Sequence, residues 1–149
     1  MGSGKGKTRR ASARQQTRNT ADKNEQLVLY HGTTDARIQS EGLRPGAYLA
    51  TSKELAWYYA EVSDEVDGLG SPMVFEVHVK RGWLEADKPS LCEPVGYGDR
   101  KSVELEEAVA THEGPLDADA SLSLVGSAYC SEAILPENIV YIHTEPWMA

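Results

Sequence analysis

The sequence predicts a single α+β domain built from short, antiparallel strands. Its 149 residues suit one domain, and a hydrophobic content of 40% can supply a core. Apolar residues alternate in some segments and recur at helical spacing in others, so strands and helices follow one another in mixed order. The chain contains no clean βαβ repeat, no G-x-G-x-x-G and no internal repeat, which argues against a Rossmann domain.

The first half of the folded region begins with an alternating apolar strand, Leu27–His31. The next stretch, "TTDARIQSEGLRPG", predicts a short helix with Thr34 as its N-cap and Gly42 at its C-terminal stop. The turn at Pro45-Gly46 leads into a strand, "AYLA".

A second helix is expected from about Ser52 to Glu61, because Thr51 and Glu54 have the spacing of a capping box. The acidic, glycine-containing "EVSDEVDGLGS" that follows is expected to be a loop.

The second half opens on a half-buried strand after Pro72, with alternating inward residues Met73, Phe75, Val77 and Val79. The segment "RGWLEADKPSLCEPVGYGDR" is expected to be irregular. A helix is expected in "KSVELEEAVATHEG", closed by Gly114, with inward residues Val103, Leu105 and Val109. Two late strands, "SLSLVGSAYCSEAIL" and "NIVYIH", complete the domain.

Charge divides the chain into two regions. Residues 1–25 carry seven Lys/Arg against two Asp/Glu, a balance of +5, whereas the remaining residues have a balance of −13. We expect residues 1–26 to form a disordered basic tail and residues 27–149 to form the folded domain. The acidic domain is a poor surface for phosphates, so the tail is the expected dock for nucleic acid or another acidic partner. A like-charged body also favours a monomer.

The phosphate-loop motif is incomplete, because "GSGKGKT" lacks its first glycine and Met1 stands there.

No hydrophobic region typical of a Sec signal or a transmembrane span is present. We therefore expect a cytoplasmic protein, with delivery by another route left open. Cys92 and Cys130 form neither a metal pattern nor a disulfide pattern, and no metal is expected.

Three short motifs carry candidate chemistry. The first is His31-Gly32-Thr33, in which a strand-end histidine can bond a ligand hydroxyl and glycine lets a ligand approach the backbone. A capped turn that enters a helix would also use small residues here.

The second motif pairs Tyr48 with Tyr59, eleven residues later. A strand–turn–helix unit folds back on itself, so the two rings are expected to line one side of a cleft and to sandwich a flat ring. The alternative is that Tyr59, with Trp57 and Tyr58, forms the core face of a helix.

The third motif contains Glu132, which interrupts a run of residues typical of a sheet interior. A carboxylate in such a place is costly unless it has a use. An edge strand with a solvated face is the alternative.

In order and spacing, the three motifs resemble the ADP-ribosyltransferase superfamily. The likeness is to its His-Tyr-Glu branch, which includes the poly(ADP-ribose) polymerases and the diphtheria-toxin-like enzymes, and it covers about residues 27–143. The resemblance implies a split β-sheet core with flanking short helices. It implies transfer of ADP-ribose from NAD+ with release of nicotinamide, to an acceptor that the sequence does not name. The small size of the chain leads us to expect mono-ADP-ribosylation.

The resemblance also assigns roles. His31 would bond the adenosine ribose, the Gly32 backbone would hold the carboxamide, and Glu132 would bond the nicotinamide ribose. Tyr48 and Tyr59 would stack on nicotinamide, while further hydroxyl contacts would come from Thr33, Thr51 and Ser52. Cys130 stands where the arginine-modifying branch has Gln or Glu, which disfavours arginine as acceptor.

The residue types suit this chemistry, because cleavage of the nicotinamide bond passes through an oxocarbenium-like transition state that an ionised carboxylate stabilises. Simple NAD+ glycohydrolysis would use the same residues. "YHGTT" followed by "EGLRPG" is also similar to the NAD+-dependent RNA 2′-phosphotransferases. A non-catalytic module that binds NAD+ or ADP-ribose is the third alternative.

Overall fold

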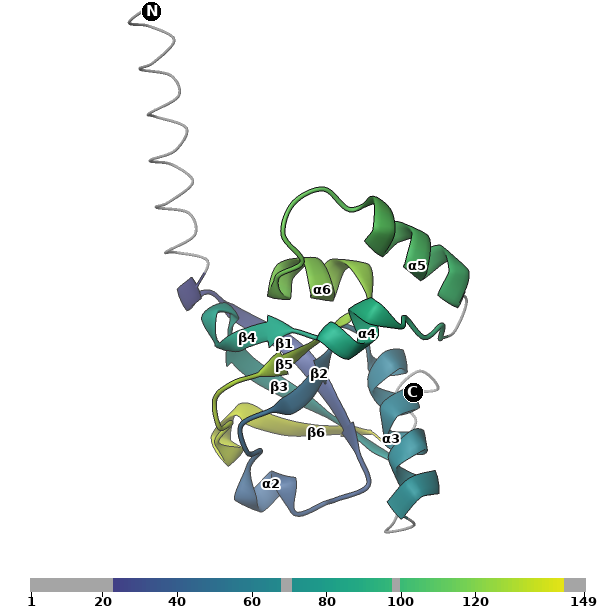
Figure 1. Ribbon diagram of the computed structural model, residues 1–149. Coiled ribbons are helices and arrows are strands. Elements are labelled where there is room, and N and C mark those ends of the chain that lie inside the picture. Colours follow the sequence, from purple (N-terminus) through teal and green to yellow (C-terminus); the bar gives the residue numbers. More distant parts are fainter. Residues whose placement is uncertain (1–22, 68–70, 98–99, 144–149) are drawn as a thin grey trace, which may run out of the picture.

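The computed structural model describes residues 23–67, 71–97 and 100–143 (Figure 1). In this part of the chain, six antiparallel strands form one sheet in the order β4-β5-β2-β1-β3-β6. The strands are β1 (Gln26–Thr33), β2 (Ala47–Ala50), β3 (Met73–Lys80), β4 (Leu84–Ala86), β5 (Ser127–Cys130) and β6 (Ile139–His143). The expected α+β class is confirmed, with an antiparallel sheet and short helices.

The helices are of unequal length. α3 (Lys53–Asp67) is the longest of those described and lies beside the sheet (Figure 1). The others are α2 (Ile38–Glu41), α4 (Lys88–Cys92), α5 (Ser102–Thr111), α6 (Ala118–Leu124) and the 3-10 turns η1 (Arg81–Trp83) and η2 (Pro136–Asn138). α4, α5 and α6 contact one another in a group near β4 and β5 (Figure 1).

The sheet has a seam between β1 and β2. β1 pairs with β3 along all eight of its residues, and β2 pairs with β5 along all four of its own. The register between β1 and β2 contains one pair, Tyr30 with Ala50. Two three-stranded halves, β4-β5-β2 and β1-β3-β6, are therefore joined by few backbone bonds at this seam.

Apolar side chains fill both sides of the sheet. The larger cluster centres on Leu29, Leu49, Phe75, Val77, Ala128 and Ile134. The smaller cluster joins α3 to the opposite face through Ala50, Leu55, Ala56 and Val74. Because neighbouring residues of a strand point to opposite faces, β3 contributes Val74 to one cluster and Phe75 to the other.

Most of the expected strands are confirmed. β1 and β3 contain the segments predicted from apolar alternation, "AYLA" matches β2 at both ends, and β6 covers all of "NIVYIH" except Asn138. Phe75, Val77 and Val79 are buried as expected, while Met73 is half-buried. Gly42 follows α2 at φ +82°, a backbone conformation that suits the expected glycine stop.

Two expected N-caps are wrong. Thr34 does not cap α2, because local turns occupy the segment: the Thr33 hydroxyl accepts from the Asp35 amide, and the Asp35 carboxylate accepts from the Arg37 amide. At α3 the Ser52 hydroxyl, in place of the expected Thr51, accepts from the Leu55 amide at 3.1 Å. α3 then continues past Glu61 to Asp67, through part of the expected loop.

The segment from Arg81 is more ordered than expected, since it contains η1, β4 and α4. The first of the two expected late strands is also wrong at its start, because residues 121–124 belong to α6, whose N-cap Asp117 accepts from the Ala120 amide. In α5, Leu105 is buried and Val109 is half-buried, but Val103 is 70% exposed and does not face inward.

Two expectations lie wholly or largely outside the described residues: the disordered tail at 1–26, of which residues 23–26 are described, and the glycine-containing part of the acidic loop. In the described ranges, no helix combines the length and apolar character needed to traverse a bilayer.

Gly32 is needed where α3 crosses β1. A Cβ atom at this position would lie 1.6 Å from the Ala56 carbonyl oxygen and 3.1 Å from the Ala60 amide nitrogen. Both neighbours are helix backbone, which cannot rotate away as a side chain does. The absence of a side chain at Gly32 therefore sets how closely α3 approaches the sheet.

We expect Gly32→Ala to lower the free energy of unfolding by at least about 3 kcal/mol, because overpacking at this contact must displace α3. Gly114→Ala is the matched control. Gly114 has φ +98°, and a methyl group there would meet nothing within 4 Å, so this change should cost about 1–2 kcal/mol from backbone conformation alone. Urea unfolding measures both. Equal losses for the two variants would contradict the contact argument.

Candidate functional site

The first two motifs meet at the seam of the sheet. The Nδ1 atom of His31, near the end of β1, lies 2.7 Å from the backbone carbonyl oxygen of Tyr48 in β2. A carbonyl accepts hydrogen bonds, so Nδ1 carries the proton and donates it. This side-chain bond links the two half-sheets close to the single Tyr30–Ala50 backbone pair.

His31 is set up to accept a second hydrogen bond. Burial lowers the pKa of His31, and the bond to the Tyr48 carbonyl offsets part of that effect. In the neutral ring with Nδ1 protonated, Nε2 is an acceptor. In the part of the chain that the structure describes, Nε2 has no hydrogen-bond partner, and no buried side-chain nitrogen or oxygen is left unpaired. Nε2 is therefore not fully buried, and it is the ring atom that is free to accept from a ligand hydroxyl.

Gly32 and Thr33 both have local structural tasks. The α3 backbone covers the side-chain position of Gly32, and the Thr33 hydroxyl accepts the Asp35 amide at 3.0 Å. The small residues of the motif thus fit the close crossing and the turn that follows. Their predicted contacts with a ligand stay predictions.

Tyr48 and Tyr59 come together as their spacing predicted. Their hydroxyl oxygens are 2.6 Å apart, and their rings meet edge to face with centroids 4.3 Å apart. The rings touch each other, so a flat ligand ring would have to part them to lie between them. Tyr129 of β5 adds a third half-buried ring, whose centroid is 4.9 Å from that of Tyr48.

A buried carboxylate that sequence reasoning missed anchors this tyrosine cluster (Tyr48, Tyr59 and Tyr129). Asp87 has no exposed surface. Its Oδ2 atom accepts from the Tyr48 hydroxyl and, at 2.6 Å, from the Ser127 hydroxyl, while Oδ1 accepts the Ser90 amide at 3.1 Å. The amide of Asp87 itself donates to the Ser121 hydroxyl.

The hydrogen bonds of the cluster run in one direction. The Tyr48 hydroxyl donates its one hydrogen bond to Asp87. At the contact with Tyr59 the Tyr48 oxygen must therefore accept, and the Tyr59 hydroxyl must donate. Ser90 Oγ is a further neighbour of the Tyr48 oxygen, at 2.8 Å. Burial, followed by the bond to Asp87, raises the pKa of Tyr48, and burial also raises the pKa of Tyr59. Both phenols therefore stay protonated at neutral pH.

One sequence signal for Asp87 existed. "DKPS" has an N-cap aspartate with proline in the first helical turn, and the structure shows this capping at α4. The pattern predicts a surface cap, however. The burial of Asp87 depends instead on Tyr48 and Ser127, which lie 39 and 40 residues away in the chain.

Glu132 lies apart from these residues. β5 ends at Cys130, so Glu132 follows the strand in an exposed bend and does not interrupt a sheet interior as expected. Among the described residues, no hydrogen bond or ion pair involves its carboxylate. Its backbone carbonyl accepts from the Cys130 thiol at 3.3 Å.

The remaining predicted contacts flank the start of α3. Thr51 is exposed, and its amide donates to the Gly126 carbonyl at 2.8 Å. The Ser52 hydroxyl is engaged as the N-cap of α3. Neither hydroxyl is brought against His31 or the tyrosine cluster by a hydrogen bond in the described residues.

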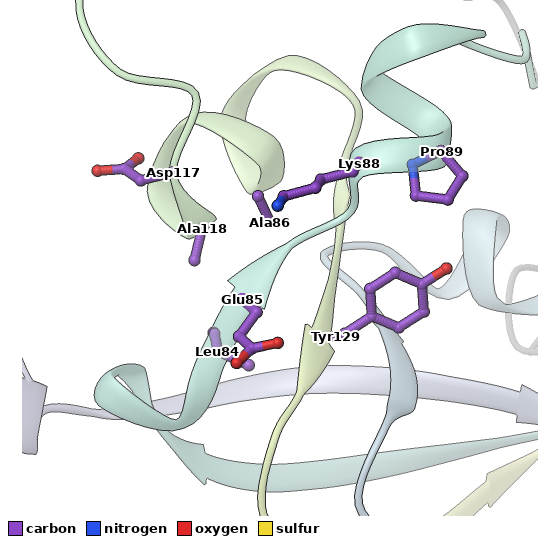
Figure 2. A pocket seen from close by; sticks show the side chains of 8 residues that line it. All are labelled: Leu84, Glu85, Ala86, Lys88, Pro89, Asp117, Ala118 and Tyr129. Carbon is purple, nitrogen blue, oxygen red and sulfur yellow. The ribbon is translucent and has the colours of Figure 1, made fainter.

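An open pocket of about 590 Å³ adjoins the tyrosine cluster on the side of β4 (Figure 2). Tyr129 is shared, because it lines the pocket and contacts Tyr48. The other lining residues are Leu84, Glu85, Ala86, Lys88, Pro89, Asp117 and Ala118. No group of three or more metal-ligating side chains is present within the described ranges.

Because its pKa is lowered in the folded state, His31 should contribute to the pH dependence of the free energy of unfolding. When pH falls from 7 to 5, the unfolded chain binds a proton at this histidine more readily than the folded chain, so the folded state loses stability. His31→Gln should remove that share, and the stability difference between wild type and variant should shrink as pH falls. Urea unfolding at several pH values measures this. His112→Gln controls for the loss of one imidazole, and a constant difference for His31→Gln would contradict the prediction.

Comparisons with known proteins give no match. No protein-family model matches the sequence, and neither the curated proteins nor the solved structures include a significant match.

Proposed function

We propose that the protein binds NAD+ at the seam of the sheet and transfers its ADP-ribose to an acceptor, with release of nicotinamide, on a split-sheet fold of the ADP-ribosyltransferase type. One observation carries this proposal. His31, Tyr48 and Tyr59, which come from two motifs and three elements, are linked at the seam by bonds of 2.7 and 2.6 Å. The order of the motifs in the sequence supports the same function.

The seam suits a ligand with two separated halves. Strand alternation places His31 on the face of Leu29, whereas Tyr48 lies on the face of Ala50. In the proposed pose the two halves of the dinucleotide lie on either side of the seam, where β1 and β2 share a single backbone pair. His31 Nε2 would accept a hydrogen bond from a hydroxyl of the adenosine ribose. The tyrosine cluster would present its aromatic faces to the nicotinamide ring.

Glu132 is the proposed catalytic carboxylate. The ribose develops positive charge as the bond to nicotinamide breaks, and an ionised carboxylate stabilises that charge. An exposed carboxylate is screened by water, so the contribution of Glu132 depends on substrate that covers the bend after β5. With water as acceptor the same residues would hydrolyse NAD+, and no metal is required in either reaction.

The acceptor remains to be identified by experiment. In this proposal the basic residues 1–25 bring an acidic partner or nucleic acid to the acidic domain, which acts as a monomer. A non-catalytic module that binds NAD+ or ADP-ribose is the second candidate, and the exposed position of Glu132 favours it, because binding at the seam does not need that carboxylate.

Nicotinamide release from NAD+ by the purified full chain tests the proposal, with and without a cell extract to supply an acceptor. We expect release in the wild type and a loss of about two to three powers of ten in Glu132→Gln, since the variant keeps the size of the side chain and removes its charge. Glu137→Gln is the matched control, because Glu137 is exposed in η2 nearby in the chain and has no proposed role.

The outcomes separate the candidates. Release that survives in Glu132→Gln removes the assigned role of this carboxylate. Binding of NAD+ without release under any condition identifies the binding module. Absence of both NAD+ binding and nicotinamide release contradicts the proposal that NAD+ is the ligand.

A further inference from the structure

We propose that the buried carboxylate of Asp87 makes the tyrosine cluster selective for a positively charged ring, so that the protein binds oxidised NAD+ in preference to NADH. The inference rests on the proposed function. It adds a specificity-determining residue that acts through Tyr48 and that touches no part of the ligand itself.

The hydrogen bonds that Asp87 receives are those of an ionised carboxylate. Tyr48, Ser127 and Ser90 all donate to it, and a carboxylate accepts hydrogen bonds without a proton of its own. The Ser90 amide can only donate, and the hydroxyls of Tyr48 and Ser127 are oriented as donors toward the same carboxylate. The fully buried group therefore carries a negative charge that neutral donors stabilise.

No cation offsets this charge in the described part of the chain. Buried charges are usually paired, yet none of the ion pairs there includes Asp87. Lys88, the next residue, is exposed and lines the pocket of Figure 2. The basic partners in those pairs are Arg37, His78 and Arg81, and each of them pairs with a carboxylate other than Asp87. The site thus keeps a net negative charge at its centre.

Tyr48 transmits this charge to the ligand side. A phenol that donates to a carboxylate gains electron density in its ring, and the negative face of an aromatic ring attracts cations. Tyr59 and Tyr129 both contact the Tyr48 ring, so the whole cluster lies in the field of Asp87. The same field raises the pKa of Tyr129, after the larger effect of burial.

The two oxidation states of the cofactor differ in the charge of the nicotinamide ring, which is the property to which this site responds. The nicotinamide ring of NAD+ is a pyridinium cation, whereas the dihydronicotinamide ring of NADH is neutral and has the same carboxamide. Contacts with the adenosine half are common to both. We therefore expect about a tenfold preference for NAD+, the size of one charge–charge attraction across roughly 10 Å at the effective dielectric of a protein surface.

The test compares dissociation constants for three ligands on the full chain: NADH from its own fluorescence, and NAD+ and ADP-ribose by displacement of NADH, read while NAD+ is still intact. In Asp87→Asn we expect NAD+ binding to weaken about tenfold, with NADH and ADP-ribose unchanged, because only NAD+ carries the cationic ring. Glu93→Gln is the matched control, since Glu93 is exposed at the other end of α4.

If Asp87→Asn fails to fold, Tyr48→Phe serves as the second variant. It removes the hydroxyl that donates to Asp87 and keeps both the ring and the charge of Asp87, so the ratio of the two affinities should fall by the part of the preference that Tyr48 transmits. Equal affinity of the wild type for NAD+ and NADH, or a preference that both variants retain, overturns this inference while leaving the proposed function intact. Failure to bind any of the three ligands overturns both.

Discussion

The hydrogen bonds that converge on Asp87 hold together the part of the molecule on which the candidate site depends. Through Tyr48 and Ser127 they fix two neighbouring strands, through Ser90 they fix α4, and through Tyr48 they reach Tyr59 on α3. A buried carboxylate is tolerated when its oxygens are fully hydrogen-bonded, and loss of one donor leaves it unsatisfied. The positions of the tyrosine rings are therefore a consequence of where this charge is buried.

Sequence reasoning succeeds where the relevant interactions are local. Apolar alternation identified β1 and β3, because a half-buried strand needs that pattern whatever it packs against, and the Pro45-Gly46 turn located the start of β2. The pairing of Tyr48 with Tyr59 followed in the same way from one strand–turn–helix unit. Each of these inferences uses residues that are close in the chain.

It fails where a local pattern has two readings or where the partner is distant. "SLSL" alternates like a strand, but the Asp117 cap that precedes it starts a helix. Glu132 is followed by apolar residues like a strand residue, yet β5 has already ended at Cys130. The burial of Asp87 depends on contacts some forty residues away, which no short window of sequence contains.

The seam also constrains how the chain folds and moves. The chain runs from β1 to β2 across the seam, returns to β3, crosses again to β4 and β5, and returns once more to β6. Neither half-sheet is made from one continuous stretch, so neither can form before distant segments have met, and the topology favours slow, cooperative folding. The four connections also tether the halves to each other. A ligand at the seam would thus be accommodated by rotation of side chains, with little opening of the sheet itself.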